Sequence, residues 1–254
     1  MNIRPFFWHN FSCMTPSKNV GASFPLVPAS ARAGRSRPHK TLRLLLLMIG
    51  VQVAARAQDA AVVGFTLDFP GSEPSHYAIS VSSDGPSSYD SDGKLSADSE
   101  GDPFHLDFSM SPETRQRVFE LAERAHYFQG EIDSRKKNLA STGRKTLTYK
   151  DSARSTTATY NYSPVVAVQQ ITQLFLSLSA TLEFGRRLQY FHRYQKLALD
   201  EELKRMEGAV TGTGLEEISA VVPILQAIAS DSSVINPVRA RAQRMIERAN
   251  SVKR

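Results

Sequence analysis

Apolar and polar residues alternate with a period of two over much of the chain between residues 61 and 162. Such alternation, with aromatic and branched side chains at the apolar positions, predicts strands, because successive side chains of a strand point to opposite faces. Strands are predicted over residues 65–69, 77–81, 104–110, 146–149 and 156–162. The Asp84-Gly85 pair predicts a hairpin turn with a return strand over Pro86–Tyr89.

Three segments place a capping residue before proline, which is the preferred order at the start of a helix. They are Ser111-Pro112, Ser163-Pro164 and Asn236-Pro237. The first helix should end before Gly130, and the second should be long, with Gly185 as a point at which it could break. Further helices are predicted over residues 200–207, 215–229 and 237–249, and Pro223 should kink or interrupt the middle one.

The order of these elements predicts an α+β fold: an antiparallel sheet of hairpins with a packed helix, followed by an all-helical C-terminal portion. We divide the chain into a leader (residues 1–57), a sheet region (58–163) and a helical region (164–254). The pattern leaves open whether the helical region is a separate domain or packs on the sheet as part of one domain.

The leader contains the three-part pattern of a secretory signal peptide. Basic residues precede the apolar run Leu44–Val53, and Ala55-Arg56-Ala57 follows it, which predicts cleavage after Ala57. The run is shorter than the roughly 20 apolar residues of a lasting membrane span. We therefore expect a protein exported to the periplasm or the cell exterior, with a signal anchor in the inner membrane as the alternative. The long stretch before the run indicates either a start codon further downstream or an atypical leader.

Composition narrows the chemistry of the exported part. The one cysteine, Cys13, and the one tryptophan, Trp8, both lie in the leader, which excludes disulfides, zinc-thiolate sites and a cysteine nucleophile from residues 58–254. The chain has 31 Lys and Arg against 25 Asp and Glu, but eight of the basic residues and none of the acidic ones lie in the leader. The exported part is therefore close to neutral.

Searches for catalytic and nucleotide-binding motifs exclude several function classes. The nucleophile elbow G-x-S-x-G does not occur. Residues 143–146 lack the glycine that a phosphate loop needs directly before its lysine, and residues 212–214 lack the third glycine of a dinucleotide fingerprint. We therefore predict no catalytic residue and no cofactor, and we lean against an enzyme.

An acidic segment is the one candidate for a metal site, because calcium prefers carboxylate oxygens. Its spacing does not fit an EF-hand, so the segment is either a solvated loop or a calcium site of another kind, and no metal is predicted. Its acidic residues are Asp90, Asp92, Asp98, Glu100 and Asp102.

Basic residues gather in and before the second predicted hairpin, where tyrosines alternate with them. This hairpin could bind a polyanion, or it could be an ordinary solvated surface. Nucleic acid is disfavoured as the partner, because an exported protein seldom meets it. The anion-binding candidates are Arg135, Lys136, Lys137, Arg144 and Lys145.

Three segments in order carry a resemblance. They are the strand and turn Tyr77–Gly85, the helix from Ser111-Pro-Glu-Thr to Ala125-His-Tyr-Phe128, and the strand Lys145–Tyr149. This order is similar to exported bacterial domains of unknown function. The resemblance covers roughly residues 65–200 and implies no activity, so it supplies no functional residue.

Three functions remain as hypotheses. The first is a non-catalytic binding or interaction module whose partner is an envelope component or another protein. The second is a hydrolase of unrecognised type, with His76, His105 and Asp107 brought together near one sheet edge. The third is a polyanion-binding or envelope-surface-binding protein that uses residues 135–154.

Overall fold

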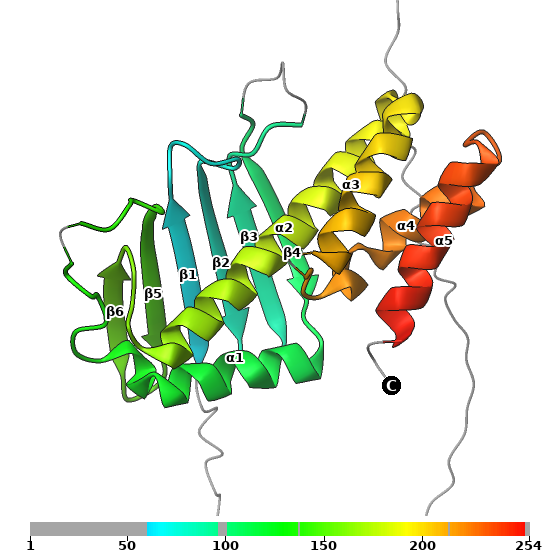
Figure 1. The fold of residues 1–254 in the computed structure, drawn as a ribbon. Coiled ribbons are helices and arrows are strands. Elements are labelled where there is room, and N and C mark those ends of the chain that lie inside the picture. The colour runs from blue at the N-terminus through cyan, green and yellow to red at the C-terminus, as the bar shows by residue number, and fades with distance from the viewer. Residues whose placement is uncertain (1–59, 96–100, 137, 213, 252–254) are drawn as a thin grey trace, which may run out of the picture. The chain divides into compact units, whose positions relative to one another are not determined.

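A computed structural model describes residues 60–95, 101–136, 138–212 and 214–251 of the chain. Within these ranges an antiparallel sheet is followed by helices, so the predicted α+β class is confirmed (Figure 1). The elements in chain order are β1 (Val62–Asp68), β2 (His76–Ser82), β3 (Pro86–Ser91), β4 (Phe104–Ser109), α1 (Pro112–Arg124), η1 (His126–Phe128), β5 (Arg144–Lys150), β6 (Ser155–Tyr160), α2 (Val166–Tyr194), η2 (Lys196–Ala198), α3 (Leu199–Thr211), η3 (Ile218–Val221), α4 (Val222–Ser230) and α5 (Asn236–Ser251).

The strands form one sheet in the order β4-β3-β2-β1-β5-β6, and every neighbouring pair is antiparallel. The central strand β1 sets the register, because Phe65 faces Ile79 of β2 on one side and Leu147 of β5 on the other. The predicted turn joins β2 to β3, and Gly85 supplies its positive φ of 126°. Among the described strands, β4 and β6 are the two edges of the sheet.

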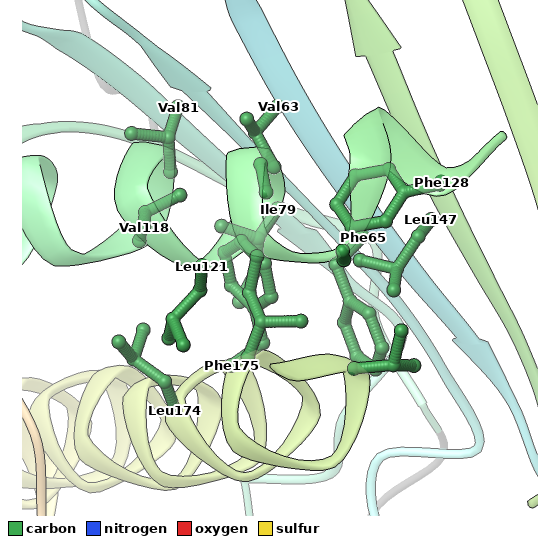
Figure 2. Packing of buried hydrophobic residues seen from close by; sticks show 14 of the residues in the cluster. Val63, Phe65, Ile79, Val81, Val118, Leu121, Phe128, Leu147, Leu174 and Phe175 are labelled. Atoms are coloured by element: carbon green, nitrogen blue, oxygen red, sulfur yellow. The ribbon is translucent and has the colours of Figure 1, made fainter. Parts of the chain in front are cut away.

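One face of the sheet is covered by α1 and by the first part of α2 (Figure 1). Side chains of β1 and β2 interlock there with those of both helices, and the rings of Phe65 and Phe175 stack at 5.2 Å (Figure 2). Burial of each large apolar side chain contributes about 1.5–3 kcal/mol. Ser111 caps α1 as predicted, because its side chain accepts a hydrogen bond from the amide of Thr114.

Helix α2 differs from the prediction at both points that the sequence singled out. It begins at Val166, two residues after Pro164, because the side chain of Ser163 accepts a hydrogen bond from the amide of Val165 before the helix starts. It also runs unbroken through Gly185. A Cβ at Gly185 would lie 2.5 Å from Cγ1 of Val221, so the glycine allows η3 to approach the helix.

The helices after α2 pack around a second apolar cluster, which begins on α2 at Phe184. Pro223 interrupts the predicted helix over 215–229: η3 ends at Val221, and the proline lies in the first turn of α4. Contacts join the sheet and these helices in one compact unit, residues 55–254. Among the described helices, none is both long and apolar enough to cross a membrane.

Candidate binding groove

A groove runs along the free side of β4. It has a volume of about 590 Å³ and lies between β4, α2 and the segment η3–α4. Figure 1 shows α4 beyond this edge of the sheet. We call it the edge groove. Its apolar lining includes Phe104, Leu106 and Phe108 of β4, Leu182 of α2, and Ile224 and Ala227 of α4.

The groove exists because α2 contacts β4 at the start of the strand, where Arg186 stacks on Phe104, and leaves the strand only partly covered. The helix crosses the sheet diagonally (Figure 1), and its buried residues up to Leu182 belong to the cluster under the sheet. From Phe184 onward they belong to the second cluster. The apolar residues of β4 face the same side as the buried residues of β1 and β2, yet they are only half-buried. They therefore form a half-buried apolar row on an edge strand.

A buried polar cluster fixes the end of the groove where β4 begins. Oε1 of Glu183 accepts hydrogen bonds from the hydroxyls of Tyr89 at 2.9 Å and Ser91 at 2.6 Å. Oε2 has no hydrogen-bond partner among the described residues and faces the guanidinium groups of Arg186 and Arg187 at 3.8 and 3.9 Å. Burial raises the pKa of the Tyr89 hydroxyl well above its usual value, so this hydroxyl stays a proton donor.

Arg186 ties α2 to the connection between β3 and β4 at two points. It donates to the carbonyl oxygens of Gly93 at 2.9 Å and Asp102 at 3.0 Å, and its guanidinium lies 4.7 Å from the ring centre of Phe104. Because these contacts occupy the guanidinium, its flat face lines the end of the groove, and its charge is not free to bind a ligand. The groove thus favours apolar ligand groups over anions.

The free edge of β4 supplies the polar side of the site. In the described part of the chain β4 pairs only with β3. Backbone N–H and C=O groups on the other side of an edge strand can pair with an added strand. A peptide that pairs with β4 would direct alternate side chains into the edge groove.

Another hollow, of about 340 Å³, lies at the end of the sheet where β2 and β4 begin and β3 ends. We call it the histidine hollow, because it brings together His76 and His105, as the hydrolase hypothesis expected, with Asp90 and Asp92. Burial opposes ionisation of Asp92, but hydrogen bonds from the Ser75 hydroxyl and the His76 amide outweigh it and lower its pKa. Asp107 of the same hypothesis lies 3.3 Å from Nε2 of His105.

The two histidines differ in what their ring nitrogens contact. Nδ1 of His76 lies 2.6 Å from Asp68, and this hydrogen bond lowers the pKa of Asp68. His105 has a carboxylate on each side, with Asp90 at 2.7 Å from Nδ1. The hydrogen bond to Asp90 raises the pKa of His105. His76 therefore has the orientation of a general base, whereas both nitrogens of His105 are engaged.

The structure does not gather the predicted anion-binding residues on one surface. Arg135 pairs with Glu131, Lys136 is exposed, and Lys137 lies outside the described residues. Arg144 and Lys145 point to opposite faces of β5, because neighbours in a strand alternate. Arg144 pairs with Asp68 at 3.1 Å on the open face, but Lys145 is buried.

Lys145 is held by the backbone of the neighbouring loops. Its ammonium donates to the carbonyl oxygens of Thr142 at 2.9 Å, Gly143 at 3.3 Å and Asn161 at 3.0 Å, and burial lowers its pKa. With these partners the ammonium holds two loops together and does not face solvent, so Lys145 does not fit the anion-binding role predicted for it.

The remaining sequence candidates lie partly outside the described residues. The cleavage residues Ala55 and Ala57, and Asp98 and Glu100 of the acidic segment, belong to the part that is not described. The described residues include no group of three His, Cys, Asp or Glu side chains arranged to hold a metal ion. Asp102 contributes its backbone carbonyl to Arg186.

The sequence interpretation missed the polar cluster at Glu183. A signal for it exists, because Glu183 is the only charged residue between Val166 and Phe184 in a strongly apolar helix. A lone carboxylate in such a stretch needs buried partners.

Comparison of the chain with protein-family models gives no match, and comparison with curated proteins gives none either.

Proposed function

We propose that this protein is a non-catalytic binding module of the cell envelope that holds an extended, apolar peptide segment of a partner protein along β4. The observation that carries the proposal is the half-buried row Phe104, Leu106 and Phe108 on a free edge strand beside a groove of about 590 Å³. The signal-peptide pattern of the leader supports the location in the envelope.

The chemistry of the groove defines the peptide. Its walls are apolar, so alternate residues of the bound segment should be apolar, while the intervening residues face away from the helices. Main-chain hydrogen bonds to β4 supply affinity that does not depend on the peptide's sequence. The groove determines which side chains of the peptide are accepted. We expect a strand of about five or six residues, the length of β4 itself.

Selection from a random-peptide library against residues 55–254 tests the proposal. Bound peptides should show apolar residues with a period of two. N-methylation of alternate peptide bonds should abolish binding, and N-methylation of the bonds between them should not, because only every second N–H of a strand points toward its neighbour. Peptides with helical spacing, or indifference to N-methylation, would contradict strand addition.

Variants of the groove provide the matched control. Leu106→Asp should lower peptide affinity by about tenfold or more, because it places a charge in the apolar wall. His105→Ser changes the preceding residue of the same strand, on the opposite face, and should leave affinity unchanged. Thermal unfolding of both variants establishes that each remains folded.

A hydrolase is the second candidate, and one observation favours it: the hydrogen bond that orients His76 toward Asp68 at the histidine hollow. If His76 acts as a general base, His76→Ala should abolish hydrolysis in a screen of ester, peptide and glycoside substrates. A folded protein that hydrolyses none of these classes, or equally well without His76, would remove this candidate.

A further inference from the structure

Exposed apolar side chains gather at one end of the helical portion. Six large apolar side chains are exposed in the described part of the chain, and three of them lie here. Leu197 of η2 is 92% exposed, Tyr194 at the end of α2 is 62% exposed, and Ile235, directly before α5, is 58% exposed. Leu197 is the most exposed of the six, so it stands out from the surface and is not part of a groove.

A side-chain contact joins the two segments that carry these residues. Nζ of Lys196 donates to Oδ2 of Asp231, in the loop between α4 and α5, at 2.7 Å. Figure 1 shows the α2–α3 junction and the α4–α5 loop at the same end of the molecule. We call Arg193, Tyr194, Lys196, Leu197 and Ile235 the helical tip.

Basic groups lie at the base of this apolar surface. The guanidinium of Arg193 lies 5.2 Å from the ring centre of Tyr194 and makes no ion pair with the described residues. The same segments also carry two carboxylates. Asp231 is shared by Lys196 and His192, and Glu201 is exposed at the start of α3.

We propose that the helical tip docks on the surface of an anionic phospholipid bilayer. Leu197 and Ile235 would enter the boundary between headgroups and acyl chains, where burial of aliphatic groups is favourable. Arg193, which makes no ion pair with the described residues, has a long aliphatic stem, which lets its guanidinium stay beside the lipid phosphates while the stem lies along the apolar layer. The ring of Tyr194 fits the level between the two, where aromatic residues concentrate at membranes.

The shape of the tip favours a lipid surface over a protein partner. Leu197 projects from a short turn, and a deformable bilayer can surround a projecting side chain from all sides, whereas a protein partner needs a matching cavity. None of the residues of the helical tip lines the edge groove, so a failure of peptide binding would not affect this proposal.

Co-sedimentation with vesicles tests the proposal. Residues 55–254 form a compact unit that includes both apolar clusters, so this unit is used without residues 1–54, whose apolar run would itself bind lipid. It should bind vesicles of equal parts phosphatidylglycerol and phosphatidylcholine, and salt should weaken the binding. Leu197→Glu should lower the partition coefficient by about tenfold or more. Leu139→Glu, the same change at another exposed leucine, should leave it unaltered.

A fluorescence measurement locates the contact. Because Trp8 is the one tryptophan and lies in the leader, Leu197→Trp gives residues 55–254 a single indole. Its emission should shift to shorter wavelength on anionic vesicles, and that of Leu139→Trp should not. Absence of vesicle binding, equal binding to pure phosphatidylcholine, or equal loss in the two Glu variants would each overturn the proposal.

Discussion

The hydroxyl of Tyr89 in β3 donates to Oε1 of Glu183 in α2 at 2.9 Å, at the point where α2 passes from one apolar cluster to the other. Arg187 extends this polar cluster to α3, because its Nε donates to Glu202 at 2.6 Å. The sheet, α2 and α3 are therefore joined by buried, mutually dependent charges at one level of the long helix.

Removal of the carboxylate at this junction should be costly. Glu183 is 3% exposed, and Glu183→Ala leaves the buried Arg186 without its counter-charge and the hydroxyls of Tyr89 and Ser91 without their carboxylate acceptor. We expect the free energy of unfolding to fall by about 3–5 kcal/mol in urea titrations. Gln170→Ala, at an exposed position of the same helix, should change it by less than about 0.5 kcal/mol. Similar values for the two variants would show that the cluster is not a stabilising junction.

Two helical glycines should respond in opposite ways to the same substitution. Gly208→Ala in α3 adds a Cβ with no atom within 4 Å, so the better helix propensity of alanine should stabilise the protein by about 0.5–1 kcal/mol. Gly185→Ala gains the same propensity but places its Cβ 2.5 Å from Val221, and overpacking of this kind costs about 1–3 kcal/mol. Thermal unfolding measures both changes.

The double variant Gly185→Ala with Val221→Ala separates packing from helix propensity. Removal of the valine methyl groups should recover part of the loss caused by Gly185→Ala, because these methyl groups are what the new Cβ meets. Additive effects of the two substitutions would contradict this explanation.

Local patterns predicted the elements of this fold but not the coverage of its sheet. The alternation of Phe104, Leu106 and Phe108 is the same as that of Val63, Phe65 and Leu67, and both sets form strands that face the helices. Whether a strand is covered depends on where α2 leaves the sheet, a long-range property that periodicity does not contain. The edge groove could therefore not be predicted, although the strand that forms it was.

The burial of Lys145, in contrast, could have been predicted from the sequence. Its neighbours at a spacing of two, Leu147 and Tyr149, were predicted to be strand residues, so Lys145 shares their buried face. Adjacent basic residues suggested a common surface, and the pleat of β5 separates them. The side chain reaches the carbonyl oxygens at the end of the strand, which lets a lysine occupy a buried position.

Substitution of Lys145 should therefore affect stability. Lys145→Ala leaves the carbonyl oxygens of Thr142 and Asn161 without a donor, and we expect a loss of about 1–3 kcal/mol in unfolding free energy. Lys150→Ala, at an exposed end of the same strand, should be close to neutral. If Lys145→Ala leaves the free energy of unfolding unchanged, water replaces the ammonium as donor to these carbonyl oxygens without loss of stability.

Polyanion binding remains a separate hypothesis and needs variants that do not disturb the fold. Charge reversal at the exposed Lys136 and Lys150 should lower retention on a heparin column if residues 135–154 bind polyanions. Reversal at the exposed Arg124, on α1 and outside this range, is the control. Equal retention of all these variants and the parent protein would remove the hypothesis.

The histidine hollow should make stability depend on pH in a defined direction. The hydrogen bond that the His105 ring donates to Asp90 is the largest cause of the raised pKa of His105, and the charge of Asp107 adds to it. A raised pKa means that the folded state holds the proton more tightly than the unfolded state, in which histidine titrates near 6.5. The stabilisation is therefore complete below about pH 6.5 and is lost as the pH rises through the pKa of the folded state.

Proton NMR titration of the His105 ring measures its pKa, and unfolding experiments across the same pH range measure the pH dependence of stability. Asp90→Asn should bring the pKa of His105 down toward its ordinary value, and Asp107→Asn should lower it by less, because Asp107 lies 3.3 Å from the ring nitrogen and Asp90 2.7 Å. His105→Gln should remove this part of the pH dependence of stability. A larger shift from Asp107→Asn than from Asp90→Asn would mean that the ring faces Asp107 in solution, and the orientation of the histidine hollow would then have to be reassigned.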